Sequence, residues 1–149
     1  MRRKIAVSLA LMMAAVAVAE GTSVMAMDAP AVQAPAAAEF GFGPRASANR
    51  VYTATLEPRE PLRLRRLQAV AIRIVDASGQ PINDAAISID GGMPEHGHGL
   101  PTQPRVTQRL GDGVYEIEGV RFSMGGWWEL KLAIDSPAGR DSVTFNLSL

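Results

Sequence analysis

The sequence predicts an all-β protein, an immunoglobulin-like antiparallel β-sandwich of about seven strands preceded by a signal peptide and a flexible Ala/Pro-rich linker. From residue 50 onward, apolar and polar residues alternate with the period of two that is typical of strands. Turns rich in Gly and Pro interrupt this alternation at near-regular intervals, and no helical repeat of apolar residues accompanies it. The chain therefore divides into a signal peptide (1–26), a disordered linker (27–49) and a β-sandwich domain (50–149).

The strands follow from the alternation itself. Val70, Ile72 and Ile74 share one face of the second segment, as expected for a strand with one side in a core. Residues 76–81 have the composition of a turn, and the Gly-Asp-Gly at 111–113 predicts a tight turn with positive φ angles. The predicted strands are 51–57, 69–75, 85–90, 105–110, 114–120, 127–134 and 143–149.

Tyr115 stands at the start of the fifth predicted strand, two residues after Gly113. This spacing resembles a tyrosine corner, in which the tyrosine hydroxyl bonds back across the edge of the sandwich. The alternative is an ordinary core tyrosine, and the predicted fold is the same in both cases.

The first 26 residues have the organisation of a secretion signal. Residues 1–4 are cationic, residues 5–19 form an unbroken apolar run, and small residues offer cleavage after Ala26 or, alternatively, after Ala19. The run of about fifteen residues is shorter than the roughly 20 that a spanning helix needs. We expect a periplasmic or secreted protein. An uncleaved signal anchor, which would tie the protein to the membrane, is the alternative.

Residues 27–49 are dominated by Ala and Pro and show no apolar periodicity. Such a segment buries too little surface to offset the entropy of ordering, so we expect a mobile linker. Phe40 and Phe42 are the exceptions. They are expected to dock on the domain, the alternative being a short partner-binding element.

Composition excludes several functions. The chain carries 15 basic and 15 acidic residues, and loss of the cationic signal leaves it slightly acidic, without the basic stripe that grips nucleic acid. It contains no cysteine, which excludes disulfides, thiolate metal sites, thiol catalysis and lipoprotein processing. Any metal ligands must come from His, Met, carboxylate or backbone groups.

Both histidines of the chain lie in one Gly- and Pro-rich loop, residues 91–104. His96 and His98 stand two residues apart, with Met93 just before them. Met124 ends another predicted loop. Imidazole suits copper and zinc, and thioether sulfur selects Cu(I). If the sandwich brings the two loops together, these four side chains are candidate ligands of one copper ion.

A copper ion at this position would be covered by Trp127 or Trp128 through a cation–π contact. The residues also allow other interpretations. The histidines would pin their own loop by bonding its backbone, Met93 and Met124 would be core or rim residues, or the loop would bind an unknown ligand. No hydroxyl nucleophile stands in a recognisable arrangement with a histidine and a carboxylate, so we do not expect an enzyme.

Four motifs together resemble the FixH/YtkA-like group of exported β-sandwich domains. The resemblance implies an immunoglobulin-like periplasmic or surface domain, which in FixH-type proteins is linked to copper supply for a respiratory oxidase. It puts His96, His98, Met93 and Met124 forward as copper ligands. FixH proper is expected to be membrane-anchored, whereas this chain has a short, cleavable signal. The motifs are Asp76-x-x-Gly79-x-Pro81, Met93-Pro94-x-His96-x-His98-Gly99, Gly113-x-Tyr115 and Phe122-x-Met124-x-Gly126-x-Trp128-x-Leu130.

The sequence therefore predicts a small periplasmic accessory protein that binds copper through the histidine loop and aids metal delivery. Its expected partner is a copper acceptor or another envelope protein, and nucleic acid is excluded. The alternative is a metal-free interaction or structural module of the envelope, with the linker supplying reach.

Overall fold

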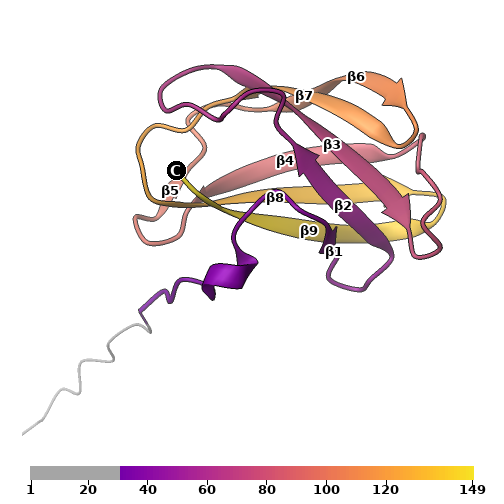
Figure 1. Cartoon of the computed structure of the whole chain (residues 1–149), viewed down its shortest axis with the longest axis horizontal. Coiled ribbons are helices and arrows are strands. Elements are labelled where there is room, and N and C mark those ends of the chain that lie inside the picture. The colour runs from indigo at the N-terminus through magenta and orange to yellow at the C-terminus, as the bar shows by residue number, and fades with distance from the viewer. Residues whose placement is uncertain (1–30) are drawn as a thin grey trace, which may run out of the picture. The chain divides into compact units, whose positions relative to one another are not determined.

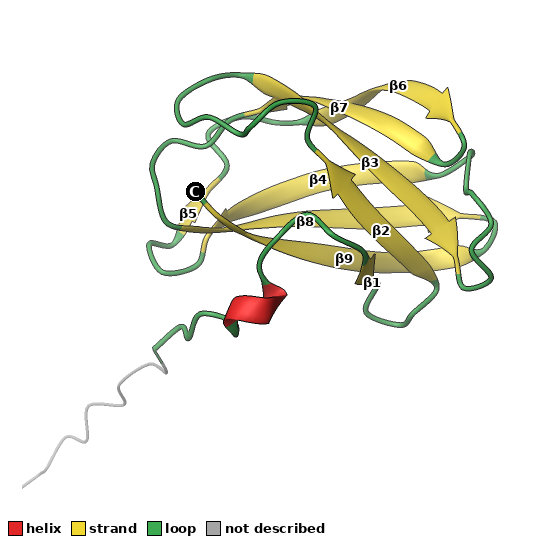
Figure 2. Ribbon diagram, viewed as in Figure 1, coloured by secondary structure: helices red, strands yellow, loops and turns green. Residues whose placement is uncertain are grey.

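The computed structural model describes residues 31–149, so the predicted signal peptide lies outside the described residues. Between Ala31 and Leu149 the chain forms nine strands and one turn of 3-10 helix, in an all-β domain (Figures 1 and 2). No helix in this part of the chain is long and apolar enough to cross a membrane. The elements are η1 (Ala37–Glu39), β1 (Arg45–Ala46), β2 (Tyr52–Glu57), β3 (Gln68–Asp76), β4 (Ala86–Met93), β5 (His98–Gly99), β6 (Arg105–Gly111), β7 (Val114–Val120), β8 (Trp127–Ser136) and β9 (Gly139–Ser148).

All seven predicted strands are present, as β2, β3, β4, β6, β7, β8 and β9. The number of strands is larger than predicted because β1 and β5 are also formed. Each of these is only two residues long, and each pairs with one longer neighbour. A pair of residues is too short to show an alternation of apolar and polar side chains, which is why the pattern did not reveal them.

The strands form two antiparallel layers that face each other across the core (Figure 2). One layer holds β2, β3, β7 and β6, and the other holds β4, β8 and β9, with β5 beside β4. The layers are joined where β6 meets β4 through a single residue pair, Ser88 with Arg105. At the opposite edge, the Ala48 N–H donates to the carbonyl oxygen of Ser142 at 2.8 Å. The sheet is thus nearly closed on itself, and few strand edges remain open.

The core is made of the residues that the alternation assigned to one face of each strand. Val70, Ile72 and Ile74 of β3 are all buried, as predicted. They pack between the layers against the inward residues of β7, β8 and β9. Apolar burial on this scale is the main stabilising contribution in a domain that has no disulfides. The buried partners on the other strands include Tyr115, Ile117, Leu130, Leu132, Ile134, Val143, Phe145 and Leu147.

Tyr115 forms the predicted tyrosine corner. Its hydroxyl donates to the carbonyl oxygen of Ile82 at 2.7 Å and accepts from the N–H of Ala85 at 2.9 Å. Both partners lie in the connection between β3 and β4, so the hydroxyl ties that connection to the core. Burial raises the pKa of Tyr115 above its usual value.

The predicted linker 27–49 ends too late in the sequence, because its last ten residues are part of the folded domain. Phe40 forms a bridge with Asn146 of β9, and its ring lies edge-on to Trp127 with 6.5 Å between ring centres. The docking of Phe40 is therefore confirmed. Phe42 remains 39% exposed, although its carbonyl oxygen accepts from the N–H of Leu56. One aromatic contact and one short strand order this segment, and Ala/Pro-rich composition conceals both.

Asp141 fastens the end of the same segment to β9. Its carboxylate accepts from the Ser47 hydroxyl at 2.6 Å and from the Asn49 backbone N–H at 3.0 Å. The Asn49 amide, the Val51 N–H and the Ser142 N–H complete the arrangement. Burial raises the pKa of Asp141, but these hydrogen bonds outweigh it and hold the pKa well below the usual value. We refer to Asp141, Ser47, Asn49 and Val51 as the Asp141 clasp.

Candidate functional site

His96 and His98 lie on a tight turn between β4 and β5, which we call the histidine hairpin (residues 91–100). β5 folds back along the end of β4, with Met93 opposite His98, and the His96 N–H donates to the Met93 carbonyl oxygen at 3.1 Å. Gly92 permits this approach, because a Cβ there would collide with the carbonyl oxygen of His98. Gly97, with φ of 63°, closes the turn. The hairpin is held by its own backbone and needs no help from the imidazole rings.

Both imidazole rings are exposed to solvent and lie beside each other. Their centres are 6.0 Å apart and their planes differ by 22°. Within residues 31–149 neither ring makes a hydrogen bond or an ion pair. The interpretation in which the histidines pin their own loop therefore finds no support in the structure. Their ring nitrogens are free to bind a ligand from solvent.

Met93 belongs to the core and not to the exposed surface of the hairpin. It is only 1% exposed, and its terminal methyl reaches Gly126, where a Cβ would come within 2.9 Å of it. Gly126 also has a φ of 126°, which favours glycine. A ligand that exchanges metal with solvent must be accessible, so Met93 acts as packing between the hairpin and the β7–β8 connection.

Met124 lies on the β7–β8 connection (residues 121–126) and is 38% exposed. Its carbonyl oxygen accepts from the indole N–H of Trp128 at 2.9 Å, which anchors the connection to the core. Trp127 donates its indole N–H to the side-chain oxygen of Asn146 at 3.0 Å. Both indole rings are buried. They therefore have no free surface with which to cover a metal at the exposed hairpin.

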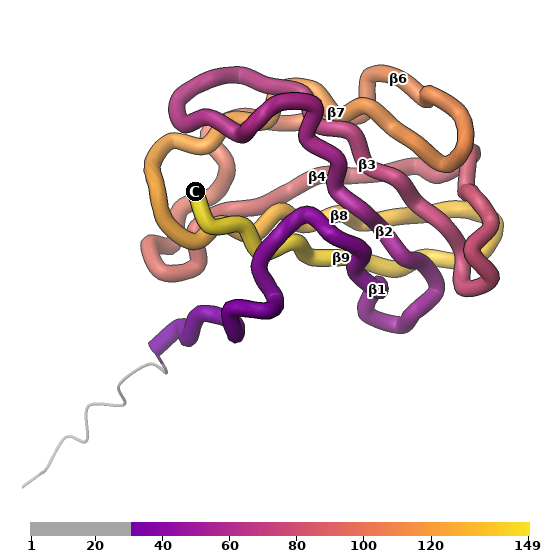
Figure 3. Tube along the Cα trace, in the orientation of Figure 1, coloured from indigo at the N-terminus to yellow at the C-terminus, as the bar shows by residue number. Residues whose placement is uncertain are grey.

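The histidine hairpin and the Met124 connection lie at the same end of the sandwich, which a site shared by the two loops requires. Figure 3 shows the β2–β3 connection, the histidine hairpin, the β7–β8 connection and the C-terminus gathered there. Backbone hydrogen bonds join the β7–β8 connection to the β2–β3 connection and to the C-terminus. The Arg65 N–H donates to the carbonyl oxygen of Phe122 at 2.7 Å, and the Gly126 N–H donates to that of Leu149 at 2.8 Å.

The sequence did not single out the carboxylates beside His98. A shallow hollow next to this ring is lined by Asp90 and Glu129, together with Lys131 and the glycines of β4. Asp90 belongs to β4, and Glu129 faces Gly92 across the β4–β8 pair. Lys131 holds Glu129 in an ion pair at 2.8 Å. In the part of the chain that the structure describes, no three His, Asp or Glu side chains converge to enclose a metal ion.

The fold and the hairpin together define a class of protein, the small β-sandwich domain that presents a pair of exposed histidines at one end. A model described as YtkA-like matches residues 46–133, a span that includes the hairpin and the Met124 connection. The match covers more than half of the chain, and the chain belongs to the YtkA-like family. This confirms the resemblance read from the four motifs.

Membership of this family supports the assignment of the chain as an accessory domain of the cell envelope. The family is not known for enzymatic activity. No curated protein and no solved structure matches the chain.

Proposed function

We propose that this protein is an exported accessory protein of the cell envelope that binds copper through His96 and His98 and passes it to an acceptor. The observation that carries the proposal is the pair of exposed, unbonded imidazole rings on a hairpin that holds its own shape. Met124 is the candidate for a third, thioether ligand because it is exposed at the same end of the sandwich. Met93 is withdrawn from the ligand set because it is buried.

The two rings are neighbours on the hairpin. Their centres are 6.0 Å apart and their planes differ by 22°, so the rings lie nearly parallel. A metal bonds an imidazole nitrogen at about 2 Å, in the plane of the ring. To share one ion, both side chains must therefore turn and direct one nitrogen each toward it, and their exposure to solvent leaves room for this rotation.

The donor set favours copper over zinc. Structural zinc sites use four enclosed protein ligands, and catalytic zinc sites use three. The described residues offer two exposed imidazoles and an exposed thioether, with no third His, Asp or Glu converging on them. Imidazole and thioether together suit copper, and the thioether selects its Cu(I) state. An open site with few ligands also allows rapid exchange, which metal delivery requires.

The test is a copper titration of the exported protein, with tryptophan fluorescence as the signal. We expect quenching that saturates at one equivalent in the wild type and is absent from the His96→Ala/His98→Ala variant. Met124→Leu should weaken Cu(I) binding and leave Cu(II) binding nearly unchanged. Arg105→Ala is the matched control, since it alters an exposed residue of β6 outside the hairpin.

Saturable quenching that persists in the double histidine variant would contradict the proposal. So would displacement of the copper by a modest excess of zinc. Absence of quenching in the wild type would favour the metal-free interaction module instead. Since His96 and His98 are the only histidines in the sequence, the imidazole resonances in an NMR spectrum report on this site without ambiguity.

The export of the protein rests on the sequence of residues 1–26 and is part of the same proposal. Amino-terminal sequencing of the protein isolated from the cell envelope or medium is expected to begin at Met27, after cleavage at Ala26. A chain that still begins at Met1 and stays with the membrane would show an uncleaved anchor.

A further inference from the structure

Positive charge is concentrated in the β2–β3 connection, residues 58–67, which we call the arginine loop. It carries Arg59, Arg63, Arg65 and Arg66 and a single acidic residue, Glu60. All five side chains are exposed. The remainder of the sandwich domain is acidic by comparison, so the charge of the domain is polarised toward this loop.

Two of these arginines have guanidinium groups without any partner in the described chain. Arg59 pairs with Glu116, and Arg65 donates from Nε to the carbonyl oxygen of Ser123 at 3.4 Å. The guanidinium groups of Arg63 and Arg66 make no ion pair in residues 31–149. They are free to bind an anion from outside.

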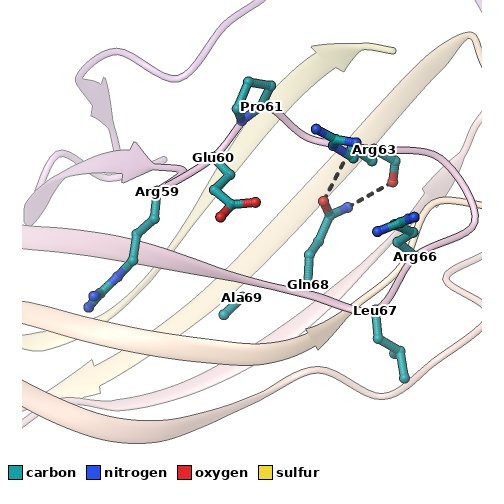
Figure 4. A pocket seen from close by; sticks show the side chains of 8 residues that line it. All are labelled: Arg59, Glu60, Pro61, Arg63, Arg66, Leu67, Gln68 and Ala69. Carbon is teal, nitrogen blue, oxygen red and sulfur yellow. Dashed lines mark hydrogen bonds between the residues drawn. The ribbon is translucent and has the colours of Figure 1, made fainter.

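The backbone of the loop is fixed before any ligand arrives. The Arg63 N–H donates to Oε1 of Gln68 at 3.0 Å, and Nε2 of Gln68 donates back to the Arg63 carbonyl oxygen at 3.1 Å (Figure 4). Arg59, Arg63 and Arg66 border the hollow shown there, with the Glu60 carboxylate between them. Because the loop is already ordered, binding of a ligand does not include the entropic cost of ordering it.

Aliphatic side chains project from the same loop. Leu67 is 69% exposed and Leu64 is 41% exposed. Leu64 forms a bridge with Phe122, which places it beside the connection that carries the exposed Met124. Singly exposed leucines are common, but here they stand next to unpaired arginines at one end of the domain.

We propose that the arginine loop docks on a bilayer that contains anionic phospholipid, with Arg63 and Arg66 on lipid phosphates and Leu67 in the boundary between headgroups and acyl chains. Guanidinium groups bind phosphate oxygens through paired hydrogen bonds, and basic residues gain further affinity from a negative surface potential. Leucines that project beyond the surface suit insertion into a lipid boundary better than contact with a folded partner, which requires matching pockets. Glu60 opposes the attraction and keeps the binding reversible.

This docking would bring the histidine hairpin near the membrane, because both lie at the same end of the domain (Figure 3). The inference does not depend on copper. Vesicle binding of the metal-free protein tests it separately from the copper titration.

The experiment is sedimentation of the exported protein with vesicles of phosphatidylglycerol and phosphatidylcholine, compared with vesicles of phosphatidylcholine alone. We expect binding to the anionic vesicles only, weakened by salt. Arg63→Glu/Arg66→Glu should reduce the partition coefficient about tenfold or more. Leu67→Asn should reduce it less, and Glu60→Gln should increase it.

The matched control is Arg50→Glu/Arg105→Glu, which makes the same change of charge at exposed positions outside the loop. It should bind within about twofold of the wild type. Circular dichroism and thermal unfolding check that each variant is folded, and the gain expected for Glu60→Gln does not depend on a loss of function.

Three outcomes would overturn the proposal. One is equal binding to neutral vesicles, which would reveal an apolar anchor. Another is equal loss of binding in the control and loop variants. The third is full release by millimolar inorganic phosphate at constant ionic strength, which would identify a site for free phosphate. Capture of an acidic protein by the loop, without vesicle binding, would identify a protein partner instead.

Discussion

The Asp141 clasp and the histidine hairpin use polar side chains in opposite ways. The Asp141 carboxylate accepts hydrogen bonds from Ser47, Asn49 and Val51, and almost none of its capacity is left for solvent. His96 and His98 are exposed and give none of their ring nitrogens to the protein. A polar group whose bonds are made within the chain stabilises the fold, and one that is left open is available for a ligand. The clasp should therefore control stability, and the hairpin should control binding.

The largest loss of stability is expected for Asp141→Ala. It leaves the Ser47 hydroxyl and the Asn49 and Val51 N–H groups without their acceptor at a buried position, and unsatisfied buried donors are costly. Chemical denaturation should show a lower free energy of unfolding than for Tyr115→Phe or the double histidine variant. Copper binding should be unchanged at temperatures where the variant is folded. A variant as stable as the wild type would show that the clasp contributes nothing.

The clasp also predicts how stability depends on pH. The pKa of Asp141 is lower in the folded chain than its usual value of 3.8, so the stabilisation is complete above that value and is lost as the pH falls below it. Unfolding midpoints of wild type and Asp141→Asn should converge as the pH falls below about 4. Asp76, whose pKa is lowered by the Ser78 hydroxyl and the Gln80 N–H, acts in the same direction but is present in both proteins. A constant difference between the two proteins down to acidic pH would contradict this assignment.

An intermediate effect is expected for Tyr115→Phe. The change removes one hydroxyl and leaves the Ile82 carbonyl oxygen and the Ala85 N–H without their partner. The expected loss is about 1–3 kcal/mol in the free energy of unfolding. Urea denaturation measures it, with Tyr52→Phe as a comparison for another buried hydroxyl. A change in the free energy of unfolding that is smaller than the error of extrapolation to zero urea would show that water replaces the missing hydrogen bonds.

The fold was predicted well because its determinants are local. Each of the seven long strands buries one face, so the alternation of side chains appears directly in the sequence, as at Val70, Ile72 and Ile74. The clasp was not predictable in this way. Asp141 acts on residues more than ninety positions earlier, and no periodicity in one chain reports such a pairing.

The candidate site was predicted in part. The two histidines are two residues apart in the sequence and share a hairpin, so their proximity in space follows from local geometry. Met93 belongs by spacing to the same loop, yet it is the last residue of β4 and points to the core. Its direction is set by the packing against Gly126, which a sequence pattern does not contain. The hollow with Glu129 depends on the β4–β8 register and was missed for the same reason.

The smallest effect on stability is expected for His96→Ala/His98→Ala, and this variant separates the two regions most sharply. The rings are exposed and make no bond to the described chain, so the free energy of unfolding should change by less than about 0.5 kcal/mol. Denaturation in the presence of a chelator measures this change, and the copper titration measures binding on the same sample. Loss of copper binding with an unchanged free energy of unfolding would show that the imidazole rings serve a ligand and do not stabilise the fold. A loss of 1 kcal/mol or more would mean that the rings support the hairpin after all, and the contrast with the Asp141 clasp would fail.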